Sequence, residues 1–281
     1  MNGKENKEKR IPLNKKQDGV EYLIFPGLEE TGVAEHLFST RLGGVSKEHL
    51  SSMNLSFSRG DKEEYVRENY RRIAKILNCD IGDFVFSHQT HTTNVRIVTE
   101  RDRGKGIVKE LDYQDVDGLV TNVPGLVLST FYADCVPVFL IEPINRVIGL
   151  CHSGWRGTVG RISEKTIEKM ELLGARREEI RAAVGPSICQ SCYEVSEDVA
   201  EAFSQEFASH QQEILLEKGG GKYLLNLWKA NELVLTDAGI VREHIEVTGL
   251  CTCCNPEYLF SHRASKGMRG NMGAFLMLKK S

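Results

Sequence analysis

A pair of apolar segments joined by a short turn constrains the fold of this chain more than any other feature of its sequence. Residues 136–141 read VPVFLI, residues 147–150 read VIGL, and Asn145 lies in the connection between them. Apolar runs of this length on either side of a turn residue predict the two strands of a hairpin. Cys135 directly precedes the first strand and His152 ends the second, so the hairpin would bring both side chains to the same end of a sheet.

The rest of the chain alternates between predicted strands and predicted helices. Further strands are expected at residues 35–39, 84–87, 95–98, 118–121, 126–131 and 180–184, and helices at residues 61–77, 158–173, 196–209 and 225–238. Residues 41–46 are expected to form a glycine-containing turn, and residues 258–278 a strand, a glycine-rich loop and a final apolar strand. Hairpin-linked strands mixed with separate helices favour a layered α+β fold over a doubly wound parallel sheet.

Composition and charge narrow the possible partners. The formal net charge of −3 does not favour nucleic acid as a partner. The longest apolar run, at residues 136–141, is far too short to span a membrane. Residues 1–20 are rich in lysine near their start and lack the apolar segment of a secretory signal, so we expect a flexible N-terminal arm followed by a single domain over residues 21–281.

The chain contains eight cysteines, some of them adjacent in sequence. In a long chain without an export signal, such cysteines are expected to be reduced thiols in a cytoplasmic protein, some of them metal ligands. The residues Cys189 and Cys192, with Cys251, Cys253 and Cys254, offer the ligands of a structural four-cysteine zinc site. A thioredoxin-like role for the first pair is not favoured, because no helix start after a βαβ strand is evident there.

Three separate segments offer soft or borderline metal ligands. His91 lies in the loop Gln89–Asn94 before a predicted strand, while Cys135 and His152 lie at the ends of the predicted hairpin. Two histidines and a cysteine would leave the fourth position of a zinc ion open to water or substrate, as in catalytic zinc sites. A buried hydrophobic cysteine and hydrogen-bonded histidines remain the alternative interpretation of these residues.

Two glycine-containing segments carry arginines that could bind an anion. Gly154-Trp155-Arg156-Gly157 leads into a predicted helix, where free N–H groups and a guanidinium could hold phosphate. A glycine-containing turn with a structural salt bridge is the alternative there. The segment Ser39-Thr40-Arg41 lies close to Gly43 and Gly44, but it lacks the spacing of a P-loop, so binding of a nucleoside triphosphate is not supported.

The signature of the zinc-dependent base deaminases is not present in the chain. That signature places H-x-E before P-C-x-x-C. Here the H-x-E sequence at His244–Glu246 follows the cysteines, and two residues separate Pro186 from Cys189. The deaminase fold is therefore rejected, although deamination as a reaction is not.

Several motifs together resemble one known family. They are residues 89–91 (QTH), 130–138 (TFYADCVPV), 151–157 (CHSGWRG), 184–188 (VGPSI), 192–195 (CYEV) and 260–263 (FSHR) through Arg269-Gly270. Over residues 20–281 the chain resembles the laccase-domain, or multicopper polyphenol oxidase-like, family, which is also regarded as a family of multifunctional purine nucleoside phosphorylases and includes a peptidoglycan-editing factor. His262 departs from the tyrosine usual at that position of the family pattern.

The resemblance implies an α+β fold, a layered mixed-sheet sandwich with flanking helices, in which residues 21–281 form a single catalytic domain. It implies zinc on His91, Cys135 and His152, with copper possible. The implied reactions are phosphorolysis of adenosine, inosine, guanosine and methylthioadenosine, and deamination of adenosine. Copper-dependent oxidation of phenols ranks lower, because the sequence lacks the histidine clusters of four-copper oxidases.

The other site residues are hypotheses about how these reactions would proceed. The catalytic group would comprise Cys135, Asp134 and Arg156. Phosphate and substrate would be held by the group Arg41, Ser39, Arg156 and, more weakly, Arg263. Asp134 would transfer protons or orient its neighbours, although a turn-capping carboxylate is equally compatible with its position, and His88 would relay protons or face solvent.

Two other classes of protein remain open. One is a cysteine hydrolase, acting for example on peptidoglycan fragments, in which Cys135 is the nucleophile and His152 the base. The other is a zinc-stabilised binding module without enzymatic activity.

Overall fold

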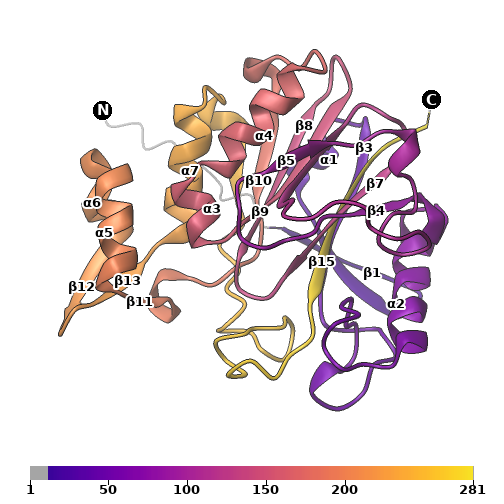
Figure 1. The fold of residues 1–281 in the computed structure, drawn as a ribbon, viewed down its shortest axis with the longest axis horizontal. Helices are drawn as coiled ribbons and strands as arrows, with labels where there is room; N and C mark the ends of the chain where they lie inside the picture. Colours follow the sequence, from indigo (N-terminus) through magenta and orange to yellow (C-terminus); the bar gives the residue numbers. More distant parts are fainter. Residues whose placement is uncertain (1–11, 281) are drawn as a thin grey trace, which may run out of the picture.

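Two six-stranded sheets lie face to face at the centre of the molecule (Figure 1). The computed structural model describes residues 12–280. The first sheet has the strand order β1 (Leu13–Gln17), β2 (Val20–Ile24), β3 (Ala34–Ser39), β15 (Met272–Leu278), β7 (Val127–Tyr132) and β4 (Phe84–Phe86). The second has the order β14 (Ile245–Val247), β10 (Arg181–Val184), β8 (Val136–Glu142), β9 (Val147–Ser153), β6 (Gly118–Thr121) and β5 (Val95–Ile97). Each sheet contains both parallel and antiparallel pairs, so both are mixed.

The predicted hairpin is β8 and β9, at the centre of the second sheet. The pairing runs from Val136 opposite Ser153 to Glu142 opposite Val147, and every residue of both strands is buried. Because successive side chains of a strand point to opposite faces, Phe139 packs toward the first sheet, whereas Val138 packs toward the outer helices. Burial on both faces explains why this segment reads as a continuous apolar run.

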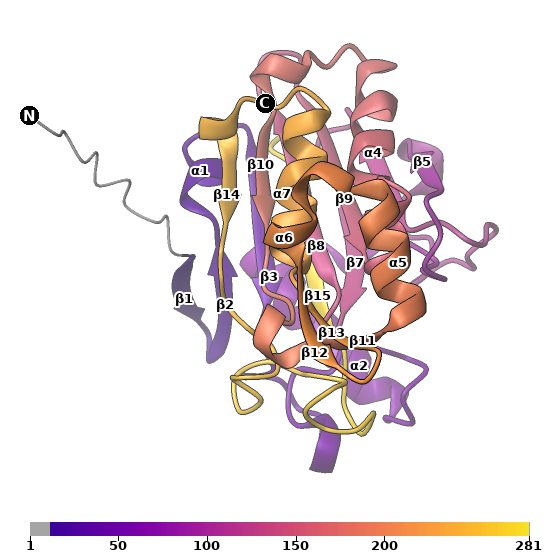
Figure 2. The same ribbon diagram turned by 90° about the vertical axis from the view of Figure 1, so that its left-hand side faces the viewer.

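Helices cover the outer face of each sheet, and those over the second sheet face the viewer in Figure 2. Helix α2 (Glu63–Ile76) covers the first sheet, with Tyr70 and Ile73 packed near Phe84 and Phe275. The second sheet is covered by α4 (Ile162–Glu171), α5 (Glu197–Glu206) and α7 (Leu227–Asp237). The observed architecture is therefore a single-domain, mixed-sheet α+β sandwich with flanking helices, which confirms the predicted fold class.

Short elements fill the connections between these layers. They are the helices α1 (Pro26–Glu29), α3 (Trp155–Val159) and α6 (Gln211–Ile214), the small sheet β11 (Glu194–Ser196), β13 (Lys222–Leu225) and β12 (Leu215–Gly219), and the 3-10 turns η1 (Glu48–Leu50), η2 (Ile81–Asp83), η3 (Glu100–Asp102), η4 (Arg177–Glu179), η5 (Gln190–Cys192), η6 (Ala208–His210) and η7 (Arg242–His244). Among the helices of residues 12–280, none has the length and apolar character needed to cross a bilayer.

The prediction of one continuous helix over residues 158–173 is wrong. The structure has two helices there, α3 and α4, which are separated at Arg161, a residue with a left-handed φ of +57°. The Arg161 guanidinium pairs with Glu206 and Asp237 from two other helices. These long-range ion pairs occur at the break, and helical periodicity within the segment cannot show them.

Other boundaries also differ from the predictions. Residues 258–270 form turns and not a strand, and Leu225 ends β13, so that α7 begins after Asn226, whose side chain accepts a hydrogen bond from the Lys229 N–H. Part of the predicted N-terminal arm, residues 13–17, pairs with β2 as strand β1. Residues 1–11 of that arm lie outside the described part of the chain.

Candidate active site

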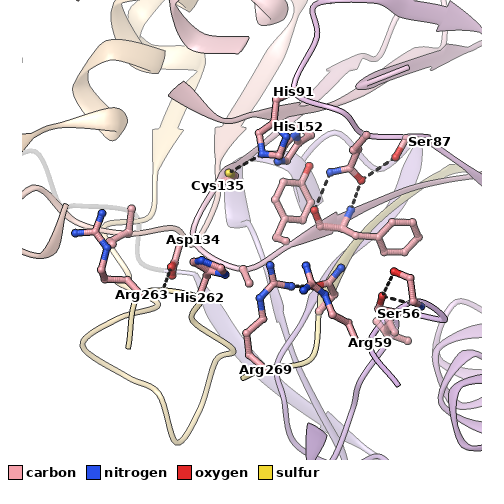
Figure 3. Close-up of a pocket in the computed structure, with 18 of the residues that line it drawn as sticks. Ser56, Arg59, Ser87, His91, Asp134, Cys135, His152, His262, Arg263 and Arg269 are labelled. Carbon is pink, nitrogen blue, oxygen red and sulfur yellow. Dashed lines mark hydrogen bonds between the residues drawn. The ribbon is translucent and has the colours of Figure 1, made fainter. Parts of the chain in front are cut away.

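A pocket of about 850 Å³ lies where the end of the central hairpin meets loops from several other parts of the chain. Its walls include the loop after β4, the turn between β7 and β8, the end of β9, and segments near residues 55–59 and 262–271. Figure 3 shows the polar side chains of these segments facing a common space. A volume of this size suits a small-molecule ligand.

His91, Cys135 and His152 converge on one side of the pocket (Figure 3). One ligand atom from each lies within 4.8 Å of the others, and Cys135 Sγ is 3.9 Å from His91 Nε2. Cys135 immediately precedes β8, and His152 is the penultimate residue of β9, so the hairpin register places them side by side. The structure therefore brings together the three residues that the sequence predicted as metal ligands.

A glycine makes this close approach possible. Gly154 follows β9 directly, and a Cβ atom at this position would lie 3.0 Å from His91 Cδ2 and 3.1 Å from Cys135 Sγ. Both distances are shorter than ordinary van der Waals contacts between side chains. Any other residue here would push the two ligands outward.

Asp117, which is not among the predicted site residues, organises this group. Its wholly buried carboxylate is 2.8 Å from His152 Nδ1 and accepts hydrogen bonds from the N–H groups of Thr90, His91 and Thr92. One carboxylate thus orients the His152 ring and the loop that carries His91. The only signal in the sequence was an acidic residue next to β6, the strand that pairs with β9.

The charges in this group are mutually dependent. Burial raises the pKa of the Cys135 thiol, but His152 and His91 outweigh burial and hold the pKa below its usual range. Burial lowers the pKa of His152, whereas Cys135 and Asp117 outweigh burial and raise it. Without a cation the pair therefore favours a thiolate next to an imidazolium, and a soft or borderline cation bound by the thiolate and the imidazole would take the place of the proton between them.

The donor set fits a metal ion. Nδ1 of His152 is engaged with Asp117, which leaves Nε2 to face Cys135, as is usual for a metal-binding histidine and its carboxylate partner. All three residues line the pocket. A cation held here would have protein on one side and the pocket on the other.

Asp134 lies next to Cys135, but its carboxylate holds segments of the pocket wall together. Its backbone has a φ of +90°, and its carboxylate accepts hydrogen bonds from Thr252 Oγ1 at 2.6 Å and from the Arg263 N–H at 2.7 Å. These contacts join the β7–β8 turn to the segment that contains Arg263. A positive φ is costly for a residue with a side chain, by about 1–3 kcal/mol, so the fold must hold this turn in place.

Only some of the predicted anion-binding residues line the pocket. Arg156 and Arg263 do, with Arg156 over the ring of Trp155 and Arg263 hydrogen-bonded to the backbone oxygens of Cys192 and Glu194. His88 also lines the pocket and accepts a hydrogen bond from the Asp115 N–H through Nδ1.

The structure does not bring Arg41 and Ser39 to the pocket. The Arg41 guanidinium donates to the oxygens of Ser51 and Pro256 and lies over the ring of Phe260. Ser39 is wholly buried and accepts a hydrogen bond from the Gly273 N–H. Both side chains therefore tie loops together, a role that the local cluster of small polar residues could not reveal.

Two arginines outside the predicted anion-binding group line the pocket instead. Arg59 and Arg269 lie near each other, and both face the pocket (Figure 3). Burial lowers the pKa of Arg269, and the positive charge of Arg59 lowers it further, to about 10. The two positive charges repel each other, so an anion bound between or beside them would be stabilised. Arg269 lies within the C-terminal motif, which was the one available signal.

Comparison with known proteins shows the family of this chain. The family model described as multi-copper polyphenol oxidoreductase laccase matches residues 35–279. The chain is 36% identical over 251 residues to purine nucleoside phosphorylase YlmD of Bacillus subtilis, covering 87% of this chain and 88% of that protein. It is also 36% identical over 228 residues to adenosine deaminase RL5 from an unknown prokaryotic organism, covering 80% of this chain and 87% of that protein.

A solved structure shows the same architecture. The hypothetical protein YfiH of Bacillus licheniformis superimposes with a TM-score of 0.88 at 32% sequence identity, covering 95% of this chain and 99% of that one. The chain therefore belongs to the laccase-like multicopper polyphenol oxidase family. Its curated relatives carry enzyme names, and the chain is an enzyme of this family.

Proposed function

We propose that this enzyme is a zinc-dependent purine nucleoside phosphorylase that also deaminates adenosine. The observation that carries the proposal is that one pocket combines a His–Cys–His group, aromatic walls and several arginines. The names of the two curated relatives support these two reactions. Adenosine, inosine, guanosine and methylthioadenosine are the proposed nucleosides, and inorganic phosphate is the second substrate.

Aromatic side chains provide a surface for the purine. Phe57, Phe131, Trp155 and Tyr193 all line the pocket. A planar base gains both apolar burial and ring stacking on such walls. The base and the ribose together fit within a pocket of about 850 Å³.

The arginines provide the phosphate subsite. Within residues 12–280, no carboxylate lies at ion-pair distance from Arg59 or Arg156, and both line the pocket. Arginine forks bind phosphate oxygens with two parallel hydrogen bonds. Arg59, Arg156 and Arg269 would hold phosphate against C1′ of the ribose as the bond from C1′ to the purine nitrogen breaks.

The remaining residues position these groups. Zinc bound by His91, Cys135 and His152 would supply a Lewis acid on one side of the pocket. Asp117 keeps the Nδ1 proton of His152 in place, so that Nε2 faces the centre of the group. Asp134 accepts hydrogen bonds on both carboxylate oxygens, and we therefore assign it to positioning of the Arg263 segment in preference to proton transfer.

The test is metal analysis of the purified enzyme combined with separation of products from adenosine. With phosphate we expect adenine and ribose 1-phosphate in addition to inosine and the hypoxanthine released from it, and without phosphate we expect inosine alone. Cys135→Ala should abolish both reactions, whereas Cys79→Ala, at a half-buried cysteine that does not line the pocket, should leave both unchanged. Formation of neither product by the zinc-loaded enzyme would refute the proposal.

A cysteine hydrolase is the second candidate. Cys135, His152 and Asp117 form a series of nucleophile, imidazole and carboxylate like that of cysteine hydrolases. This arrangement could cleave an amide, such as one in a peptidoglycan fragment. Inactivation by iodoacetamide that added zinc does not slow would favour this candidate, whereas protection by zinc favours the phosphorylase.

Copper-dependent phenol oxidation is supported only by the description of the family model. Within residues 12–280, the clustered metal ligands are the His–Cys–His group and a set of four cysteines. Neither supplies the set of several histidines that a multicopper oxidase centre uses. We therefore rank this activity below the two nucleoside reactions.

A further inference from the structure

Four cysteines outside the pocket form a second cluster of metal-ligating groups. The Sγ atoms of Cys189, Cys192, Cys251 and Cys254 all lie within 4.8 Å of one another. Cys192 Sγ is 3.4 Å from Cys254 Sγ, and Cys189 Sγ is 3.9 Å from the same atom. The residues come from two loops and form two C-x-x-C pairs, the commonest spacing of structural zinc sites.

The fold brings these two loops together through its second sheet. Strands β10 and β14 are parallel neighbours, and one cysteine pair follows each of them. A further bridge pairs Ser187 with Cys251, so the pairing continues beyond the strands to the cluster. Both loops thus leave the carboxyl ends of neighbouring parallel strands, which explains why residues about 60 positions apart meet in the cluster.

The separations fit a single ion. Four sulfur atoms around one zinc ion, each about 2.3 Å from the metal, would be about 3.8 Å apart. The distances of 3.4 and 3.9 Å, and the upper limit of 4.8 Å, agree with that size. A cluster of four iron atoms needs its thiolates farther apart, because the iron and sulfide atoms lie between them.

The backbone around the cluster is arranged to stabilise a thiolate. The N–H groups of Cys189 and Cys254 point at Cys251 Sγ, at 3.2 and 3.4 Å. Cys251 is buried, so these two donors replace the water that would otherwise solvate a negative sulfur atom. Neutral thiols have little need for two such donors, whereas a metal-bound thiolate does.

We propose that Cys189, Cys192, Cys251 and Cys254 bind a structural zinc ion. Four protein ligands fill a tetrahedral zinc ion, so this site has no position for substrate and differs in kind from the three-ligand group in the pocket. The proposal stands on the cysteine cluster alone and does not depend on the nucleoside chemistry proposed above.

The ion would connect two walls of the pocket. Asn255 Nδ2 donates to the oxygen of Cys251, at the start of the segment that contains His262, Arg263 and Arg269. The Arg263 guanidinium in turn donates to the oxygen of Cys192 in the other loop. This segment lacks helix or strand structure over residues 252–271 and is held by the buried side chains of Leu259 and Phe260, so the zinc ion would supply a second anchor.

The experiment counts zinc in the purified full-length protein and in single variants. We expect about two zinc ions per chain in the wild type, and about one in both Cys254→Ser and Cys192→Ser. Cys253→Ser is the matched control, because Cys253 adjoins Cys254 but lies outside the cluster, and it should retain both ions. Cys135→Ala should remove only the pocket ion, so failure of one site can be distinguished from failure of the other.

Outcomes at the cluster itself decide the proposal. Equal zinc content in Cys254→Ser and in wild type would overturn it, as would an iron content with visible absorbance that disappears in the same variant. An intact mass lower by two hydrogens, with Cys192 and Cys254 joined, would show a disulfide and would also overturn it.

Alkylation of the wild-type protein provides a test that does not require a variant to fold. Cys254 is exposed and should react at once with iodoacetamide if its thiol is free. If zinc is bound, we expect Cys189, Cys192 and Cys254 to be protected together and to become reactive together when a chelator is added. Protection that is independent of the chelator, or immediate labelling of Cys254, would refute the zinc site.

Discussion

The buried carboxylate of Asp117, which directly precedes β6, lies 2.8 Å from Nδ1 of His152 on the neighbouring strand β9. The same carboxylate accepts hydrogen bonds from three N–H groups of the loop that holds His91. Two of the three candidate metal ligands are therefore oriented by one residue that does not itself belong to the ligand group. This dependence leads to the first prediction.

Asp117→Asn should weaken metal binding without removing a ligand. An amide can accept only some of these hydrogen bonds and carries no charge to stabilise the imidazole, so we expect zinc affinity to fall by about 10–100-fold. Competition with a chromophoric chelator measures this change. Asp115→Asn, at a neighbouring residue that bonds Thr90 Oγ1, is the control, and the same loss of affinity in both variants would contradict the assigned role.

Gly154→Ala should disturb the same group by steric pressure alone. The new methyl group would lie 3.0–3.1 Å from His91 and Cys135, so one or both side chains must move. We expect weaker zinc binding while the circular dichroism spectrum stays unchanged. Gly82→Ala, where a Cβ atom would meet open space, should bind zinc like the wild type. Unchanged zinc affinity in Gly154→Ala would show that the pocket does not need this glycine.

Arg156→Ala should raise the KM for phosphate much more than it slows deamination of adenosine. Loss of charge-assisted hydrogen bonds worth about 1.5–3 kcal/mol corresponds to about a 10–100-fold change. The KM of Arg156→Lys for phosphate should lie between those of Arg156→Ala and the wild type, because lysine keeps the positive charge but lacks the planar fork. Steady-state kinetics of both reactions measure this difference, and equal losses in the two reactions would remove the phosphate role from Arg156.

His36 should make the stability of the fold depend on pH. Burial lowers the pKa of this histidine to about 4, and its Nε2 accepts a hydrogen bond from the Phe25 N–H. The unfolded chain, with an ordinary histidine pKa near 6.5, binds the proton more readily than the folded chain does. The stabilising contribution is therefore complete above about pH 6.5 and is lost as the pH falls toward 4.

Denaturant unfolding between pH 4 and pH 7 tests this contribution of His36. His36→Gln keeps an acceptor for the Phe25 N–H but cannot titrate, so its free energy of unfolding should fall less steeply with acid than that of the wild type. His210→Gln, at an exposed ion pair, should follow the wild-type curve. Identical pH profiles of wild type and His36→Gln would contradict the prediction.

The sequence predicted those features that depend on local patterns. The apolar run at residues 136–141 indicated the central hairpin, and the hairpin register then placed Cys135 beside His152. The break at Arg161 was not predictable, because its partners Glu206 and Asp237 are distant in sequence.

The assignment of the pocket arginines shows the same limit. Arg41 occurs in a glycine-containing segment that suggests anion binding, yet its guanidinium donates hydrogen bonds to the backbone oxygens of Ser51 and Pro256. Arg59 and Arg269 come from segments about 210 residues apart and have no distinctive spacing. Which arginine faces a pocket and which one ties a loop depends on tertiary contacts, and residue type alone does not determine it.

The hairpin that carries Cys135 and His152 is buried on both faces, whereas Arg59, Arg263 and Arg269 lie on loops. The two hairpin ligands and these arginines thus lie on parts of the molecule that differ in their tolerance to substitution. Substitutions or insertions in the loops can therefore change which substrate is accepted while the hairpin keeps its geometry. The same scaffold is accordingly a favourable starting point for directed evolution of new substrate preferences.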